Sequence, residues 1–306
     1  MLALLAIGRL VHPGLYERYL KGLLDRLSAL GVVPILGPGL ALLVAFFFLP
    51  ILVLVGISFQ TEFAPGTVTG LTLANYAAIF GDAYFLATLG RTLGMGVAVA
   101  ATALLIGYPV AYHVTRLESP RRRAFFLLLV MVPYLTSVVV RTFGWLMILL
   151  QNGFLNVALR WAGLTEEGVK LVNNEYGIYI GLVHVFLPVA VISLMTSLGK
   201  IDPSLERAAR DLGASRLGVL RHVLLPLSRK GLLGGFLLVF ALTISSFTTP
   251  SILGGTTEVM ATAIYTYVGY LTNFNLAAAL AIVLMAVAIV VIVVSNHLGG
   301  GRRGTV

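Results

Sequence analysis

Cysteine is absent from this chain of 306 residues, and charged residues make up only 11% of it. Without cysteine the chain can form neither a disulfide framework nor a thiolate metal site. An ordinary soluble domain carries roughly a quarter charged residues, whereas 58% of this chain is hydrophobic and its mean hydropathy is +0.98. Because such a chain has too little polar surface to cover itself in water, lipid must be the solvent for much of its surface.

Acidic residues are missing where the chain is most apolar. Six stretches reach the length of about 20 residues that a helix needs to cross the hydrocarbon core. They contain no Asp or Glu, and Arg141 is their only Lys or Arg; they cover residues 36–57, 92–113, 125–150, 176–198, 231–253 and 276–298. Their apolar runs are continuous, which favours helices over the alternating pattern of barrel strands. The sequence therefore predicts an all-α polytopic membrane protein with six transmembrane helices.

The net charge of +9 does not indicate a nucleic-acid partner, because the basic residues are confined to a few segments. Most of the 21 Lys and Arg residues lie before the first span, in the second and fourth loops, or after the last span. By the positive-inside rule these segments face the cytoplasm, so both termini are expected there. We predict a cytoplasmic N-terminal arm (1–33), a transmembrane domain (34–299) and a cytoplasmic tail (300–306). Within the arm, residues 15–30 have the pattern of an amphipathic helix that either lies on membrane lipid or docks to a partner.

The fourth loop, residues 200–230, contains helix signals of its own. Asp202 is a plausible N-cap, and Gly213 is placed to end the helix that follows it in the left-handed conformation. Ser215 is placed to cap a second short helix, which Pro226 is expected to end. The loop is thus predicted to form a helix–turn–helix elbow. Physical reasoning alone leaves two roles open for the elbow: transmission of force to a partner, or a basic linker on the membrane surface.

The elbow resembles the EAA loop of ABC importer permeases, whose pattern is Glu-Ala-Ala, three residues, Gly, nine residues and then Ile-x-Leu-Pro. The matching residues are Ala208, Ala209, Gly213, Val223, Leu225 and Pro226. One position departs from the pattern: Arg207 stands where the family has glutamate, and Glu206 comes one residue earlier. Because one residue turns a helical side chain by about 100°, Glu206 is expected to point in a different direction from the family's glutamate.

The resemblance continues outside the elbow. The segments VVVRTFGWLMILLQNGFLN (138–156), GLVHVFLPVAVISLMTSLGKID (181–202) and FTTPSILGG (247–255) are similar to the first permease of spermidine/putrescine-type importers. The resemblance implies the transmembrane domain of a type I importer in the bacterial cytoplasmic (inner) membrane. It implies that a small solute, a polyamine or related amine, reaches the cytoplasm by alternating access. The implied partners are a second related permease, two cytoplasmic ATPase subunits and an extracytoplasmic solute-binding protein.

No Walker A sequence occurs in the chain, so ATP and Mg²⁺ are expected on the partner ATPases and no cofactor is expected on this chain. The sequence also shows no convincing cluster of nucleophile, base or metal ligands, so we expect a translocation subunit and not an enzyme. The alternative is a secondary transporter or channel subunit that works without an ATPase. Such a protein would more naturally show internal repeats or acids within its spans, and neither is visible.

Candidates for the translocation pathway come from two of the apolar stretches: Arg141, Trp145, Thr248, Thr249 and Pro250. A charge within a span is costly and usually faces a cavity or partner, although Arg141 could also reach the interface or join a structural pair. Trp145 could line the same path or belong to the aromatic belt. The hydroxyls beside Pro250 could line a cavity or pack helices together. Since the spans offer no acid to a cationic polyamine, the identity of the solute stays open.

Overall fold

The structure, a computed structural model, describes residues 33–61 and 70–299. Within these residues the chain is helical, and one isolated antiparallel bridge joins Gln60 to Leu71. The chain divides into two compact units, residues 1–56 and 57–306. The amphipathic helix predicted at residues 15–30 and the predicted tail (300–306) lie outside the described residues.

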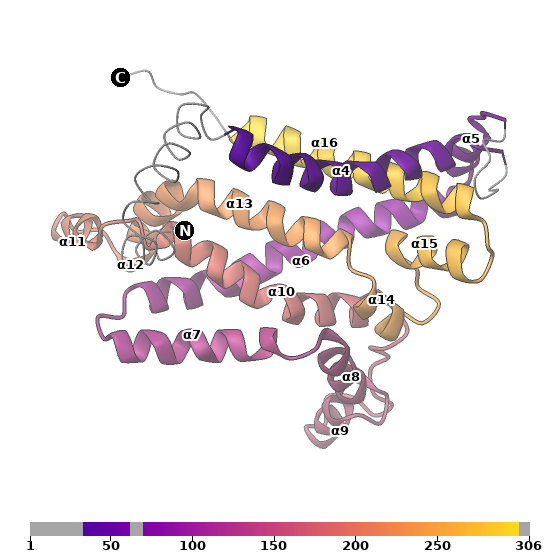
Figure 1. Ribbon diagram of the computed structural model, residues 1–306. Coiled ribbons are helices and arrows are strands. Elements are labelled where there is room, and N and C mark those ends of the chain that lie inside the picture. Colours follow the sequence, from indigo (N-terminus) through magenta and orange to yellow (C-terminus); the bar gives the residue numbers. More distant parts are fainter. Residues whose placement is uncertain (1–32, 62–69, 300–306) are drawn as a thin grey trace, which may run out of the picture. The chain divides into compact units, whose positions relative to one another are not determined.

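The first unit holds most of α4 (Val33–Ser58). The second unit contains the other described helices, and Figure 1 labels all of them except η2. They are α5 (Ala74–Gly81), α6 (Ala83–Thr115), α7 (Pro120–Leu135), α8 (Val138–Leu149), α9 (Phe154–Trp161), α10 (Glu175–Leu198), α11 (Pro203–Asp211), α12 (Arg216–Val219), the π-helix η2 (Leu220–Leu224), α13 (Leu225–Ile244), α14 (Thr248–Leu253), α15 (Met260–Gly269) and α16 (Phe274–Gly299).

The predicted number of spans is confirmed, because six helical stretches among the described residues are long and apolar enough to cross a membrane. Four predicted windows lie within single helices: residues 36–57 in α4, 92–113 in α6, 176–198 in α10 and 276–298 in α16. Their continuous apolar sequence was sufficient to place them. The two remaining windows need correction.

The third window, residues 125–150, is not one helix. It is divided into α7 and α8 by Thr136, whose backbone is extended, and by Ser137, whose backbone is not helical. Pro133 lies in the last turn of α7 and has no N–H with which to continue the hydrogen-bond ladder. The Thr136 hydroxyl donates to the freed Pro133 carbonyl at 2.7 Å, which stabilises the helix end. The stretch that qualifies as the third span is Val138–Trp161, which takes in α8 and α9.

The fifth window, residues 231–253, is also two helices, α13 and α14. In addition, the expectation that Pro226 ends the short helix after Ser215 is wrong. The chain runs from α12 through the π-turn η2 directly into α13, and the N–H of Leu225 bonds the carbonyl of Leu220. A proline ring crowds the carbonyl four residues earlier and offers no N–H to it. The wider π-turn just before Pro226 avoids that conflict, so the helix continues.

The centre of the second unit is built from α6, α10 and α13 (Figure 1). Val99, Leu194 and Phe240, one from each helix, are fully buried there. Where α13 passes α10, a Cβ built on Gly231 would lie 2.1 Å from the Cβ of Ser197. Only glycine fits at this position, because the two helix backbones approach closely there, as is common in membrane bundles.

We expect Gly231→Ala to lower the thermal stability of the protein, because overpacking a close helix contact typically costs about 1–3 kcal/mol. Gly234 in the same helix is the matched control, since nothing lies within 4 Å of a Cβ built on it. Gly234→Ala should leave stability unchanged or raise it by up to about 1 kcal/mol. Thermal unfolding of both variants in detergent makes the comparison, and equal midpoints would contradict the close α10–α13 contact.

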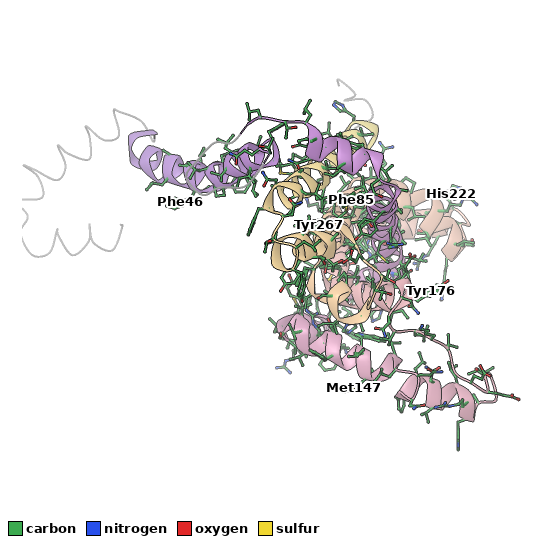
Figure 2. The ribbon with its side chains drawn as sticks, turned by 90° about the vertical axis from the view of Figure 1, so that its right-hand side faces the viewer. Phe46, Phe85, Met147, Tyr176, His222 and Tyr267 are labelled. Carbon is green, nitrogen blue, oxygen red and sulfur yellow. The ribbon has the colours of Figure 1, made fainter. Side chains whose placement is uncertain are left out.

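A second apolar cluster joins α5, α6, α15 and α16 around Ile79, Met260 and Leu280. Figure 2 shows Phe85 of α6 near Tyr267 of α15, and their ring centroids are 5.7 Å apart. Met147 of α8, labelled in the same view, is 64% exposed. The surface of α8 is therefore left for contact with lipid or another chain.

Candidate functional site

The elbow has the local geometry that its sequence predicts. Asp202 caps α11 by accepting a hydrogen bond from the Ser204 N–H at 2.8 Å, and Ser215 caps α12 by accepting from the Gly218 N–H at 3.1 Å. Hydrogen bonds from the backbone and side chain of Ser204 lower the pKa of Asp202. Gly213 has a φ of +88°, where a residue with a side chain would cost about 1–2 kcal/mol. The turn between α11 and α12 therefore depends on this glycine.

Glu206 points from α11 into the protein and is only 4% exposed. Its Oε1 accepts a hydrogen bond from Nε of Arg116 at 2.7 Å, and its Oε2 accepts from the Tyr112 hydroxyl at 2.6 Å. Arg210, one turn later on α11, places its Nη2 3.8 Å from Oε2. Arg116 also donates to the carbonyl of Leu198 at 3.4 Å. This network, which we call the Glu206 network, ties α11 to the ends of α6 and α10.

Other residues of α11 face outward. Arg207 and Ala208 are exposed, whereas Ala209 is half-buried against the core. Leu205, Ala208 and Leu212 share one side of the helix, at spacings of three and four residues. Leu205 is 46% exposed and Leu212 is 89% exposed. We call these three residues the apolar face of α11; large apolar side chains exposed together indicate a contact surface.

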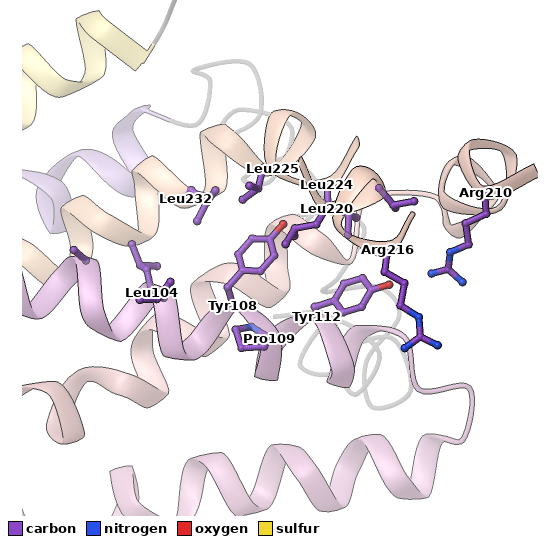
Figure 3. Close-up of a pocket in the computed structure, with 13 residues that line it drawn as sticks. Leu104, Tyr108, Pro109, Tyr112, Arg210, Arg216, Leu220, Leu224, Leu225 and Leu232 are labelled. Atoms are coloured by element: carbon purple, nitrogen blue, oxygen red, sulfur yellow. The ribbon is translucent and has the colours of Figure 1, made fainter. Parts of the chain in front are cut away.

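The remaining residues of the EAA pattern lie where η2 meets α13. Val223 packs against the core, and Leu225 and Pro226 begin α13. A groove of about 910 Å³ lies between α6 and the η2–α13 segment (Figure 3). Its lining is mainly apolar, with charged and hydroxyl groups toward one end: Tyr112, Arg210 and Arg216. Next to this groove, the Glu206 network supplies direct polar contacts between the elbow and α6.

Two of the pathway candidates lie together on α8. Arg141 and Trp145 are one turn apart, and the Trp145 ring meets His184 of α10 edge-on, with centroids 5.4 Å apart. The Arg141 guanidinium carbon lies 6.0 Å from the centre of the Tyr134 ring. His184 was not among the candidates predicted from the sequence. Its position as a polar residue in an apolar stretch was the only sequence feature that could have pointed to it.

The other pathway candidates pack helices in this structure. Thr249 and Pro250 are buried, and Thr248 is half-buried. The hydroxyls of Thr249 and Thr142 lie 3.2 Å apart, which joins α14 to α8. A Cβ on Gly181 of α10 would lie 2.7 Å from Cγ2 of Thr249. The structure therefore places Thr249 in the packing of α14 against α8 and α10, and the role of these residues in a translocation pathway stays a prediction.

Residues 103–298 match the protein family described as "Binding-protein-dependent transport system inner membrane component". The chain belongs to this family. Its members are the non-catalytic transmembrane subunits of ABC importers, so this permease is a multi-pass protein of the inner membrane, as predicted.

Relatives of this permease are named for different solutes. The spermidine/putrescine transport system permease protein PotB of Escherichia coli (strain K12) is 34% identical over 214 residues, which cover 70% of this chain and 77% of that protein. A probable molybdenum ABC transporter permease protein of Haloferax volcanii is 33% identical over 208 residues, which cover 66% of this chain and 72% of that protein. Because the two identities are so close, identity at this level does not fix the solute.

A solved structure has the same fold as this permease. The crystal structure of a bacterial ABC transporter that imports the acidic polysaccharide alginate contains a chain that matches with a TM-score of 0.67. The match covers 91% of this chain and 98% of that chain at 19% identity. Together with the six membrane-length helices, it confirms the predicted all-α transmembrane domain of a type I ABC importer.

At the start of α6, the permease carries a second charged cluster that the sequence did not reveal. Nε of Arg91 lies 2.6 Å from Oε1 of Glu175, and Nη1 of Arg91 donates to the Glu258 carbonyl at 2.9 Å. The Glu258 carboxylate accepts hydrogen bonds from Thr266 at 3.0 Å and from the Tyr84 hydroxyl. These residues come from segments far apart in the sequence, so no spacing could have predicted their pairing.

Proposed function

We propose that this permease works with a second related permease, two cytoplasmic ATPase subunits and an extracytoplasmic solute-binding protein. ATP and Mg²⁺ bind the ATPases, and the solute crosses between the permeases by alternating access. The basic α6–α7 loop and the basic elbow lie at the same end of the second unit (Figure 1). Their clustering supports a cytoplasmic position for that end and for both termini, by the positive-inside rule.

The observation that carries this proposal is the two-sided construction of α11. On one side the Glu206 network joins the helix to the ends of α6 and α10. On another side the apolar face presents Leu205 and Leu212 to a partner. Movement of an ATPase bound to that face would therefore pass to two membrane helices through a buried ion pair. Residues 200–230 are, on this proposal, the coupling loop.

We propose further that the solute is a polyamine or a related small amine. Sequence similarity to PotB supports this assignment. At the end of α6 opposite the elbow, Tyr176 and Tyr179 line a cavity of about 520 Å³ together with Glu175 and Arg91, which pair with each other at 2.6 Å. The aromatic faces of the two tyrosines attract ammonium groups. The described spans contain no acid other than Glu175, at the first residue of α10, so the second permease would supply further acids along the path.

Reconstitution of the complete importer in liposomes tests the assignment. With its binding protein present, spermidine or putrescine should stimulate ATP hydrolysis and accumulate inside, whereas molybdate should do neither. Stimulation by molybdate but not by polyamines would contradict the proposed solute, and the assignment of the protein as an importer subunit would still stand. Transport of solute without a copurifying ATPase would instead favour a secondary transporter or channel.

A further inference from the structure

Arg141 lies in the first turn and a half of α8, and its charge has no acidic partner among the described residues. Its Nε and Nη1 atoms are buried and form no hydrogen bond within the described part of the chain, and the same is true of Nδ1 of His184. Trp145, one turn from Arg141 on α8, meets the His184 ring edge-on, with ring centroids 5.4 Å apart. Arg141 of α8 and His184 of α10 therefore both carry buried nitrogen atoms that have no partner in the described part of the chain.

Buried polar groups are nearly always hydrogen-bonded, and a charge within a membrane span normally has a partner. This chain does not provide that partner in its described spans, because their only acid, Glu175, is paired with Arg91 at 2.6 Å. The aromatic contact of Arg141 with Tyr134, at 6.0 Å, satisfies none of its N–H groups. Within the described part of the chain these atoms therefore have no acceptor, which leaves them available to one from another molecule.

We propose that Arg141 and His184 form a binding site for a carboxylate that another molecule supplies. A carboxylate complements the guanidinium in charge and in planar hydrogen-bonding geometry. The N-terminus of α8 adds to the attraction, because Ser137 provides no side-chain cap for it and helix N-termini carry partial positive charge. The carboxylate belongs either to a side chain of the second permease or to the solute. The first of these two sources depends on the proposed function, in which this chain pairs with a second permease.

Carbodiimide cross-linking distinguishes these sources. In the complete importer, Arg141→Lys places an amine in the site, and dicyclohexylcarbodiimide converts an amine and an adjacent carboxylate into an amide with loss of one water. If the second permease supplies the carboxylate, mass spectrometry will find the peptide containing position 141 joined to a peptide of that subunit. If the solute supplies it, the peptide will gain the mass of the solute less one water, only during transport. Polyamines have no carboxylate, so this second result would exclude them while supporting the site.

Arg160→Lys, on α9, is the control and should give neither product. If Arg141→Lys prevents assembly of the importer, His184→Lys places the amine on the opposite side of the same site. An assembled complex that yields no amide at either position, at rest or during transport, would overturn the proposal. That failure would leave the importer assignment standing, because the assignment depends on the elbow and on ATPase copurification.

Discussion

Glu206→Gln is expected to abolish solute-stimulated ATP hydrolysis and to destabilise the elbow, although the chain should still insert into the membrane. The substitution leaves Arg116, whose side chain is only 17% exposed, without its acidic partner. Removal of one member of a buried ion pair costs about 3–5 kcal/mol. The second cation near Glu206, Arg210, is half-exposed and 3.8 Å away, so it contributes much less. The dominant loss is thus the tie between α11 and α6.

Two further variants separate this effect from a general effect of lost charge. Arg207→Gln changes the neighbouring exposed residue and should behave like the wild type. Glu206→Gln combined with Arg116→Gln should be more stable than Glu206→Gln alone, because the double variant has no unpaired buried charge. Thermal unfolding and stimulated ATP hydrolysis of the reconstituted complex are the two measurements. Wild-type values for Glu206→Gln in both would show that the network does not couple α11 to the spans.

Ala208→Glu should prevent the ATPase subunits from copurifying with the permease. Ala208 is exposed at the centre of the apolar face of α11, so a larger side chain there disturbs no packing within the described part of the chain. At an interface, however, it would obstruct close approach and bury an unpaired carboxylate, which is strongly unfavourable. Both effects act on the complex and leave the folded permease intact.

The matched control for Ala208→Glu is Arg207→Glu, which places the same side chain about 100° around the helix. We expect that variant to retain its ATPase subunits. Ala209→Glu is a poorer probe, because Ala209 is half-buried against the protein's own core. Equal ATPase retention by Ala208→Glu and the wild type would show that this face is not the contact surface.

Local signals predicted local structure well. Asp202, Gly213 and Ser215 act through their own backbone geometry, and each has the role that its residue type suggests. Prolines were less predictable, because their effect depends on the surroundings. Pro188 lies inside the unbroken α10, whereas Pro133 lies two residues before the end of α7. Hydropathy alone could not distinguish these cases, since the apolar sequence continues through both.

The candidate site was less predictable, because it depends on contacts between distant segments. Glu206 and Arg116 are 90 residues apart in the sequence, and no spacing rule joins them. The structure shows Glu206 pointing inward, toward Tyr112 and Arg116, and how this direction compares with that of the family's glutamate stays a prediction. Arg141 was conspicuous as a charge in an apolar stretch, but only packing of α8 against α10 places it near His184.

Contact between α11 and the ATPase is tested most directly by a photoreactive probe attached at Ala208→Cys. The permease has no other cysteine, and the other subunits can be used in cysteine-free form. After illumination of the assembled, active importer, the captured peptide is identified by mass spectrometry. We predict capture of an ATPase peptide from Ala208→Cys and none from Arg160→Cys. Capture of lipid alone at Ala208→Cys, in a complex that still hydrolyses ATP in response to solute, would contradict a coupling role for α11.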